Sequence, residues 1–123
     1  MVAEDQDDVR LTTVESLRDL GYTVVHAASG AEALDVLSRH GGAALLLTDV
    51  VMPGMNGREL SERAHSLYPD LKVVFTTDNA ADAIGSEGRL ASGILVLLKP
   101  FTTAQLAAFI RAAIDNEEQV PCR

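Results

Sequence analysis

The sequence alternates between short apolar runs and segments with helical spacing, and this alternation restricts the fold more than any other feature. Apolar runs occupy residues 23–27, 44–49, 71–77 and 93–99. They are apolar along their whole length, which is typical of strands covered on both faces of a parallel sheet. The opening residues "MVA" fit the end of a further strand that is either very short or truncated. We therefore predict an α/β fold, in which a doubly wound, parallel, five-stranded sheet carries helices on both faces.

The segments between the apolar runs have the spacing of amphipathic helices. Three sets of apolar residues recur at helical intervals: Leu11, Val14, Leu17 and Leu20; Ala33, Leu34 and Leu37; and Leu60, Ala64 and Leu67. A last helix is predicted to end near Asp115. Residues 79–92 are the weak segment, because Gly85 and Gly88 each cost a helix about 1 kcal/mol relative to alanine. We expect this segment to be short or mobile, and residues 116–123 to be a polar tail of one domain that spans residues 1–123.

Two helix starts carry the pattern of a capping box, in which a hydroxyl residue is followed three positions later by Glu or Gln. Ser29 with Glu32 forms one such pair, and Thr102 with Gln105 forms the other. The helix that contains Leu60 is expected to start after Asn56 and Gly57, so that residues 50–57 form a loop.

Composition and charge exclude several classes of partner. The 123 residues carry 10 basic and 18 acidic side chains, a formal net charge of −8, and no basic stripe that would attract a phosphate-rich surface. We therefore expect no contact with nucleic acid or a membrane. The apolar runs are too short to cross a bilayer and the acidic N-terminus is unlike a signal peptide, which predicts a cytoplasmic protein. The single cysteine, Cys122, is interpreted as an incidental exposed thiol.

Charged and hydroxyl side chains stand where the predicted strands end. They are Glu4 and Asp5 after the first strand, Asp49 after the third, Thr77 after the fourth and Lys99 after the fifth. Open parallel sheets bind their ligands beyond the carboxyl ends of the strands. Three carboxylates that meet there repel one another unless a cation lies among them, and an all-oxygen set suits Mg²⁺, which commonly works on phosphates. With Lys99 as a fixed positive charge and Thr77 as a hydroxyl donor, the site is suited to hold a phosphoryl group beside Asp49, whose carboxylate can act as a nucleophile.

These residues resemble the receiver domains of two-component response regulators. The acidic pair "ED" at 4 and 5, the stretch "TDVVMPGMNG" around Asp49, the Thr77 that ends "VVFTT" and the "KPF" at 99–101 occur in the family's order over nearly the whole chain. The stretch "GRLASGILVLLKPF" is similar to receivers at the C-terminus of hybrid histidine kinases. The resemblance implies a flavodoxin-like (βα)5 fold with the strand order 2-1-3-4-5.

The resemblance also implies the chemistry of the site. Asp49 would be the phosphoacceptor, which takes a phosphoryl group from the phosphohistidine of a histidine kinase or a histidine phosphotransfer protein. Asp5 and Asp49 would ligate Mg²⁺ together with the backbone carbonyl of Val51, while Glu4 would reach the metal mainly through water. Lys99 would pair with the phosphoryl oxygens.

A conformational switch is a further implication of the resemblance. Thr77 would turn inward on phosphorylation, and the Lys99–Pro100 peptide would be cis, which is chemically plausible because cis bonds are essentially confined to X-Pro. The signal would pass through the face made by residues 79–92, the strand at 93–99 and the last helix. A homodimer through this face is also expected.

Three features depart from the family's pattern. The residue after the switch threonine is Asp78, where the family usually has Ala or Gly, and a carboxylate there could repel the phosphoryl group or point away. Val96 stands where an aromatic residue commonly swings with the threonine. The weak helical pattern of residues 79–92 lies in the face that such domains use for signalling.

Two other functions fit parts of the same pattern. A phosphatase of the haloacid dehalogenase type would need a second Asp two residues after Asp49, as acid and base, but this position is Val51. An interaction module that is never phosphorylated is disfavoured by the complete set of site residues and mildly favoured by Asp78 and Val96. We therefore expect no conventional enzyme, only a domain that assists its own phosphorylation and dephosphorylation.

Overall fold

The computed structural model of the chain describes residues 1–78 and 95–115. Its sheet has five parallel strands in the order β2-β1-β3-β4-β5. The strands are β1 (Val2–Ala3), β2 (His26–Ala27), β3 (Leu45–Asp49), β4 (Lys72–Thr77) and β5 (Leu95–Leu98). The helices of the described residues are α1 (Asp7–Asp19), α2 (Gly30–Arg39), α3 (Gly57–Leu67) and α4 (Thr103–Asp115). The predicted fold class and strand order are confirmed. Two predicted segments lie outside the described residues: the helix expected at 79–92 and the tail at 116–123, which contains Cys122. The helix labelled α4 therefore corresponds to the last helix that the sequence predicts.

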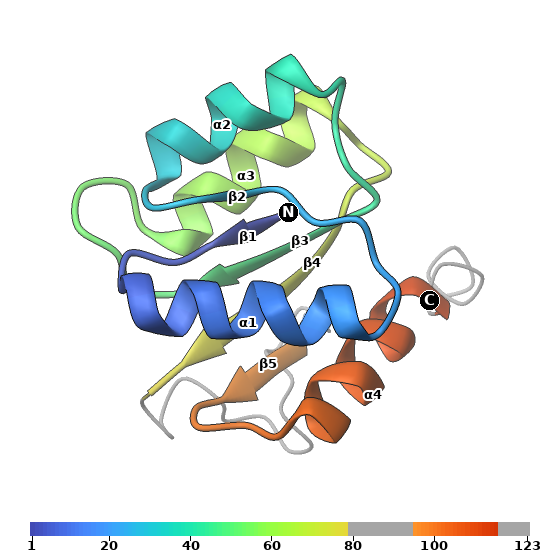
Figure 1. Cartoon of the computed structure of the whole chain (residues 1–123). Helices are drawn as coiled ribbons and strands as arrows, with labels where there is room; N and C mark the ends of the chain where they lie inside the picture. Colours follow the sequence, from blue (N-terminus) through green and yellow to red (C-terminus); the bar gives the residue numbers. More distant parts are fainter. Residues whose placement is uncertain (79–94, 116–123) are drawn as a thin grey trace.

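The helices lie in two layers, one on each face of the sheet. Figure 1 shows α1 and α4 on one face and α2 and α3 on the other. Because every strand is parallel to its neighbours, the chain must return across a face of the sheet between consecutive strands. The carboxyl ends of all the strands consequently meet at one edge.

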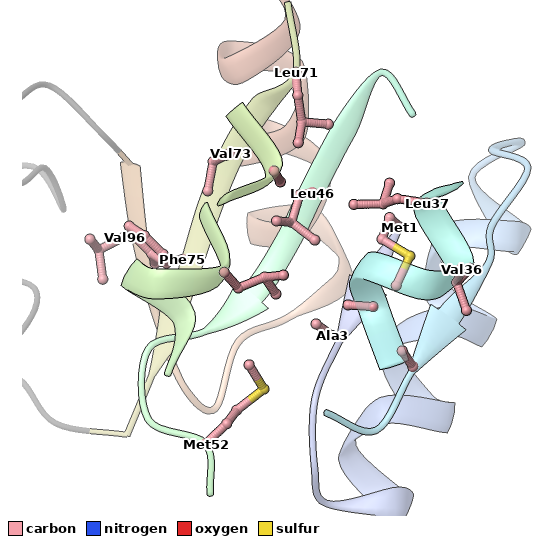
Figure 2. Packing of buried hydrophobic residues seen from close by; sticks show 14 residues of the cluster. Met1, Ala3, Val36, Leu37, Leu46, Met52, Leu71, Val73, Phe75 and Val96 are labelled. Atoms are coloured by element: carbon pink, nitrogen blue, oxygen red, sulfur yellow. The ribbon is translucent and has the colours of Figure 1, made fainter. Parts of the chain in front are cut away.

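Two hydrophobic cores fill the space between the sheet and its helices. Neighbouring strand residues point to opposite faces, so Leu46, Phe75 and Val96 pack toward α2 and α3, whereas Leu47 and Val74 pack toward α1 and α4. Figure 2 shows the first of these clusters, with Phe75 of β4 beside Val96 of β5 at one end and Leu46 of β3 on the side of Leu37 of α2. The strands are therefore apolar on both sides, as the continuous apolar runs predicted.

Some apolar residues assigned to buried helix stripes are exposed, which corrects the sequence-based prediction. Val14 and Leu17 are buried in α1, but Leu11 is 52% exposed and Leu20 is 40% exposed. A step of three residues falls about 60° short of a full helical turn, so a series at positions 11, 14, 17 and 20 rotates off the buried face at both ends. At the end of α3, Leu67 is 61% exposed, because the next residue, Tyr68, packs on α2 in its place and donates a hydrogen bond to the carbonyl of Leu37 at 3.4 Å.

The helix starts follow the predicted capping patterns with two differences. Thr102 and Gln105 form the reciprocal pair, with N···O distances of 2.8 and 3.0 Å. The hydroxyl of Ser29 accepts from the amide of Glu32 at 3.1 Å, but the Glu32 carboxylate accepts from the amide of Ala28 and not of Ser29.

The second difference concerns α3, which begins at Gly57 and not after it. Asn56 is its N-cap and forms a full capping box with Glu59. The spacing of Asn56 and Glu59 was the signal in the sequence that could have identified this start.

β1 is short and lies second in the sheet, yet it joins β2 to the other three strands. The amide of Val2 donates to the carbonyl of Val25 at 3.0 Å, and the amide of Glu4 donates to the carbonyl of Ala27 at 3.1 Å. On the other side, the amide of Leu47 donates to the carbonyl of Met1 at 2.8 Å. These bonds fix the backbone where β1 ends, and Glu4 is the next residue.

Candidate functional site

The carboxyl edge of the sheet brings the predicted site residues together. Glu4 and Asp5 follow β1, Asp49 is the last residue of β3, Thr77 is the last residue of β4 and Lys99 follows β5. An open pocket at this edge is lined in part by Asp5, Asp49, Val51, Thr77 and Asp78. Side chains far apart in the sequence therefore share one site.

The three carboxylates form a compact acidic cluster. Glu4, Asp5 and Asp49 each offer an oxygen atom, and these oxygens all lie within 4.8 Å of one another. Glu4 and Asp49 are buried and Asp5 is half-buried. A group of like charges so close together has no stable arrangement in a low dielectric unless cations neutralise it. The all-oxygen set and the spacing of its atoms fit Mg²⁺, which prefers carboxylate and water ligands.

Lys99 places one positive charge directly in this cluster. Its ammonium Nζ donates to Glu4 Oε1 at 3.0 Å and to Asp49 Oδ2 at 3.1 Å, and its side chain is only 8% exposed. Each of these two carboxylates also accepts from a backbone amide: Glu4 Oε2 from Gln6 at 3.2 Å, and Asp49 Oδ1 from Val51 at 3.4 Å. The cluster is thus held by one buried lysine and by the loops that follow β1 and β3.

Burial and pairing act on the pKa values of Glu4 and Lys99, and both pKa values are raised. Burial raises the pKa of the Glu4 carboxyl, and the nearby Asp49 adds to this effect, although hydrogen bonds from Lys99 and Gln6 oppose it. Burial alone would lower the pKa of Lys99, but hydrogen bonds and attraction from Glu4 and Asp49 outweigh burial, so the pKa of Lys99 is raised. The geometry therefore keeps Lys99 charged beside Asp49.

The loop after β3 is fixed to the sheet by close backbone contacts. The amide of Val50 donates to the carbonyl of Thr76 at 2.9 Å, and the amide of Gly57 donates to the carbonyl of Val50 at 2.8 Å. A Cβ atom at Gly57 would overlap the carbonyl oxygen of Asp49. Glycine at this position lets the start of α3 approach the backbone of Asp49, a role that the sequence prediction did not assign.

Arg10 is a second residue that the sequence prediction missed. It lies on α1, with a side chain that is 12% exposed. Its Nη1 donates to the carbonyl of Glu4 at 3.1 Å, and its Nη2 pairs with Asp7 Oδ1 at 2.7 Å. Arg10 thereby ties the loop after β1 to the first turn of α1. An isolated arginine in a helix gives no signal of such a contact in the sequence.

The backbone near Lys99 agrees with the expectation for this segment. The Lys99–Pro100 peptide bond is cis. The amide of Lys99 donates to the carbonyl of Thr77 at 2.7 Å, which continues the pairing of β4 and β5 beyond the last strand residue. Lys99 is therefore aligned with the end of β4 as well as with the acidic cluster.

The residues that depart from the family's pattern occupy distinct environments. Asp78 is exposed and its Oδ1 lies 3.5 Å from Lys99 Nζ, so it points toward the site and not away from it. Val96 is 1% exposed and pairs in register with Phe75 in the core that faces α2 and α3. Val51, which occupies the position of the second Asp of haloacid dehalogenases, is 68% exposed and brings no acid to the site.

No helix among the described residues combines the length and the apolar character that a membrane span requires.

Comparison with known proteins identifies the family. The profile described as "Response regulator receiver domain" matches residues 1–111. The chain is 43% identical over 101 residues to the response regulator receiver protein CpdR of Brucella abortus, and this match covers 82% of the chain and 83% of the relative. It is also 35% identical over 119 residues to the sensor kinase CckA of Brucella abortus, but this match covers 96% of the chain and only 13% of the kinase.

Solved structures give the same result. The receiver domain of the hybrid histidine kinase CckA superposes with a TM-score of 0.75 at 32% sequence identity, over 92% of this chain and 95% of that one. The fold, the acidic edge of the sheet and both sequence matches agree. The chain therefore belongs to the family of response regulator receiver domains of two-component systems.

Proposed function

We propose that Asp49 is the phosphoacceptor of this receiver domain. The observation that carries the proposal is the position of Asp49 within one acidic cluster, with Lys99 Nζ at 3.1 Å from Oδ2 and at 3.0 Å from Glu4. A carboxylate beside a fixed cation can attack phosphorus, and the cation then stabilises the charge that the phosphoryl oxygens carry. The proposed domain spans residues 1–123.

Mg²⁺ is the proposed cofactor, held by Asp5, Asp49 and the backbone carbonyl of Val51, with Glu4 acting mainly through water. When bound, it would neutralise the phosphoryl oxygens and orient the donor. The support for this assignment is the donor set of three carboxylates within 4.8 Å and the pocket beside them. These ligands leave coordination positions for water and for phosphate, as Mg²⁺ requires.

The reaction forms one bond and breaks another. An oxygen of Asp49 attacks the phosphorus of a phosphohistidine, the P–N bond breaks, and the nitrogen keeps its electron pair. Lys99 transfers its hydrogen bonds to the phosphoryl oxygens, which add a charge of about −1.5 to −2 at the strand ends. Thr77 is proposed to donate its hydroxyl to the same group. The receiver is therefore not a conventional enzyme, since it acts only on its own carboxylate.

The proposed partner is a histidine kinase or a histidine phosphotransfer protein, and the proposed location is the cytoplasm. The family supports both assignments. Signalling and homodimer formation are proposed for the face made by residues 79–92, β5 and α4; its first segment lies outside the described residues.

The test is intact-mass spectrometry after incubation with acetyl phosphate, with and without Mg²⁺. The native protein is expected to gain the mass of one phosphoryl group only with Mg²⁺. Asp49→Asn is expected to gain none. The adduct should be removed by hydroxylamine, which cleaves acyl phosphates.

Asp70→Asn is the matched control, because Asp70 is exposed at the opposite end of β4. It should be labelled like the native protein. If Asp49→Asn were labelled as well, the acceptor would be another residue. If no variant were labelled by any donor, the interaction module that is never phosphorylated would be the better interpretation.

A further inference from the structure

Asp78 is a carboxylate beside the site that the proposed reaction does not use. It follows the last residue of β4, its side chain is 77% exposed, and its Oδ1 lies 3.5 Å from Lys99 Nζ. The side chains of Glu4 and Asp49, which also contact this ammonium, are 5% and 10% exposed. Asp78 therefore lies at the mouth of the pocket that has Asp49 in its lining.

Its contact with Lys99 adds little to folding. Exposed ion pairs contribute little to stability, and Lys99 is already neutralised by two closer, buried carboxylates. The charge of Asp78 instead acts on molecules that enter the pocket, because an exposed charge attracts or repels ions over about one Debye length. The molecules that must enter are phosphodonors, and they are anions.

The direction of attack determines which part of a donor meets Asp78. In phosphoryl transfer the attacking and leaving atoms lie roughly in line on opposite sides of phosphorus. Asp49 attacks from the buried side, so the leaving group departs through the open mouth, where Asp78 lies. An anionic leaving group is repelled there, whereas a leaving group that carries a proton on nitrogen is attracted.

We propose that Asp78 selects among phosphodonors: it disfavours acyl phosphates relative to donors with a protonated nitrogen on phosphorus. The proposal rests on the proposed function of Asp49. With acetyl phosphate, the bond between phosphorus and the acetyl oxygen breaks and acetate leaves with the electron pair. With phosphoramidate, which is protonated on nitrogen, the P–N bond breaks and ammonia leaves. Each reaction forms one bond from Asp49 to phosphorus and needs no other reactant.

The test compares the initial rates of phosphorylation by these two donors, measured by intact mass at one Mg²⁺ concentration. Asp78→Asn removes the charge at nearly constant size. It should raise the ratio of the acetyl phosphate rate to the phosphoramidate rate about two- to fivefold, which is the range for one exposed charge interaction. The effect should be large at about 0.01 M salt and nearly absent at about 1 M, where the Debye length is about 3 Å. Asp78→Glu keeps the charge and should retain the native ratio of rates.

Asp70→Asn is again the matched control, since it changes the net charge equally from the far end of β4 and should leave the ratio unchanged. Equal acceleration with both donors would show that Asp78 does not discriminate between them, and a gain that persists at high salt would show that the effect is not electrostatic; either result would overturn the proposal. If Asp49 were labelled and the ratio of the acetyl phosphate rate to the phosphoramidate rate were the same in every variant, the proposal on Asp78 would be overturned while the proposed function of Asp49 would stand. Absence of labelling in all proteins with both donors would overturn the two together.

Discussion

At the scale of single residues, the site depends on one buried cation. Lys99 lies between Glu4 and Asp49, and its pKa is raised by them. A cation whose pKa is raised in the folded state contributes stability that is fully present below its ordinary pKa of 10.5 and is lost as the pH rises through the raised value. The contribution of Lys99 is therefore constant across neutral pH.

Replacing Lys99 by methionine should destabilise the protein in a pH-dependent manner. Without Mg²⁺, two buried carboxylates lose their partner, so we expect the free energy of unfolding at neutral pH to fall by about 3–5 kcal/mol. The pKa of Glu4 is already raised, and it would rise further without the hydrogen bond from Lys99. Protonation of Glu4 in acid then removes the negative charge that has lost its partner. Urea unfolding of both proteins at neutral pH and near pH 4 should show that the difference shrinks in acid.

Lys72→Met is the control for this prediction, because Lys72 begins β4 at the edge of the sheet away from the site. Its effect should be small and the same at both pH values. A loss for Lys99→Met that is equal at both pH values would mean that packing of the lysine stem, and not charge, is responsible.

Gly57→Ala tests the close approach of α3 to Asp49. Because the new methyl group would overlap a backbone carbonyl, the loop or the helix must shift, and we expect a loss of about 1–3 kcal/mol. The displacement of Asp49 should also slow its phosphorylation. Urea unfolding and intact-mass labelling measure the two effects. Ser66→Ala, at an exposed position of the same helix, should leave both unchanged.

Single residues also show what the sequence could predict and what it could not. Glu4, Asp5, Asp49 and Lys99 were predictable because strand ends in a parallel sheet converge at one edge. The contact of Asp78 with Lys99 was not predictable, since an exposed side chain after a strand can point into the site or into solvent. The same holds for Gly57, whose requirement for a small residue comes from a carbonyl eight positions earlier in the chain.

At the scale of elements, helix starts set the geometry of the loops at the site. Asn56 and Glu59 hold the first turn of α3 through N···O distances of 2.9 and 3.1 Å. The loop that they close begins directly after Asp49. The capping box therefore stabilises the loop beside the phosphoacceptor as well as the helix.

Asn56→Ala should lower the free energy of unfolding by about 1 kcal/mol, the usual cost of losing an N-cap. Glu59→Ala should cost less, and the double variant should cost less than the sum, because both changes disrupt one reciprocal pair. Chemical denaturation of the four proteins measures the coupling. Glu62→Ala, at an exposed position of α3, is the control. Strict additivity would show that the two hydrogen bonds act independently.

The strands were predictable in number and order but less so in extent. The continuous apolar runs gave the strands, yet the run at 23–27 pairs only at His26 and Ala27, because β1 beside it offers two residues to pair with. Apolar composition marks burial, whereas strand length depends on the neighbouring backbone. The exposed Leu11 and Leu20 follow from the same difference between composition and geometry.

At the scale of the whole molecule, binding of Mg²⁺ should stabilise the fold. A ligand that binds only the folded state adds about 2.7 kcal/mol at 100 times its dissociation constant. The melting temperature of the native protein should therefore rise with Mg²⁺ concentration, and Asp5→Asn should reduce this rise. Differential scanning fluorimetry measures both, with Asp70→Asn as the control of equal charge. An identical rise in Asp5→Asn would exclude Asp5 from the metal site.

The short pairing of β1 has a mechanical consequence. β1 pairs with β2 and with β3 at only two positions each, whereas β3 pairs with β4 at five. Tension across the sheet would accordingly act first on the two short junctions of β1, one of which joins it to β3. Glu4 and Asp49 lie on opposite sides of this junction. An ion bound by both would be a reversible cross-link over one of the two short junctions of the sheet, and it would couple the chemical state of the site to the resistance of the molecule to being pulled apart.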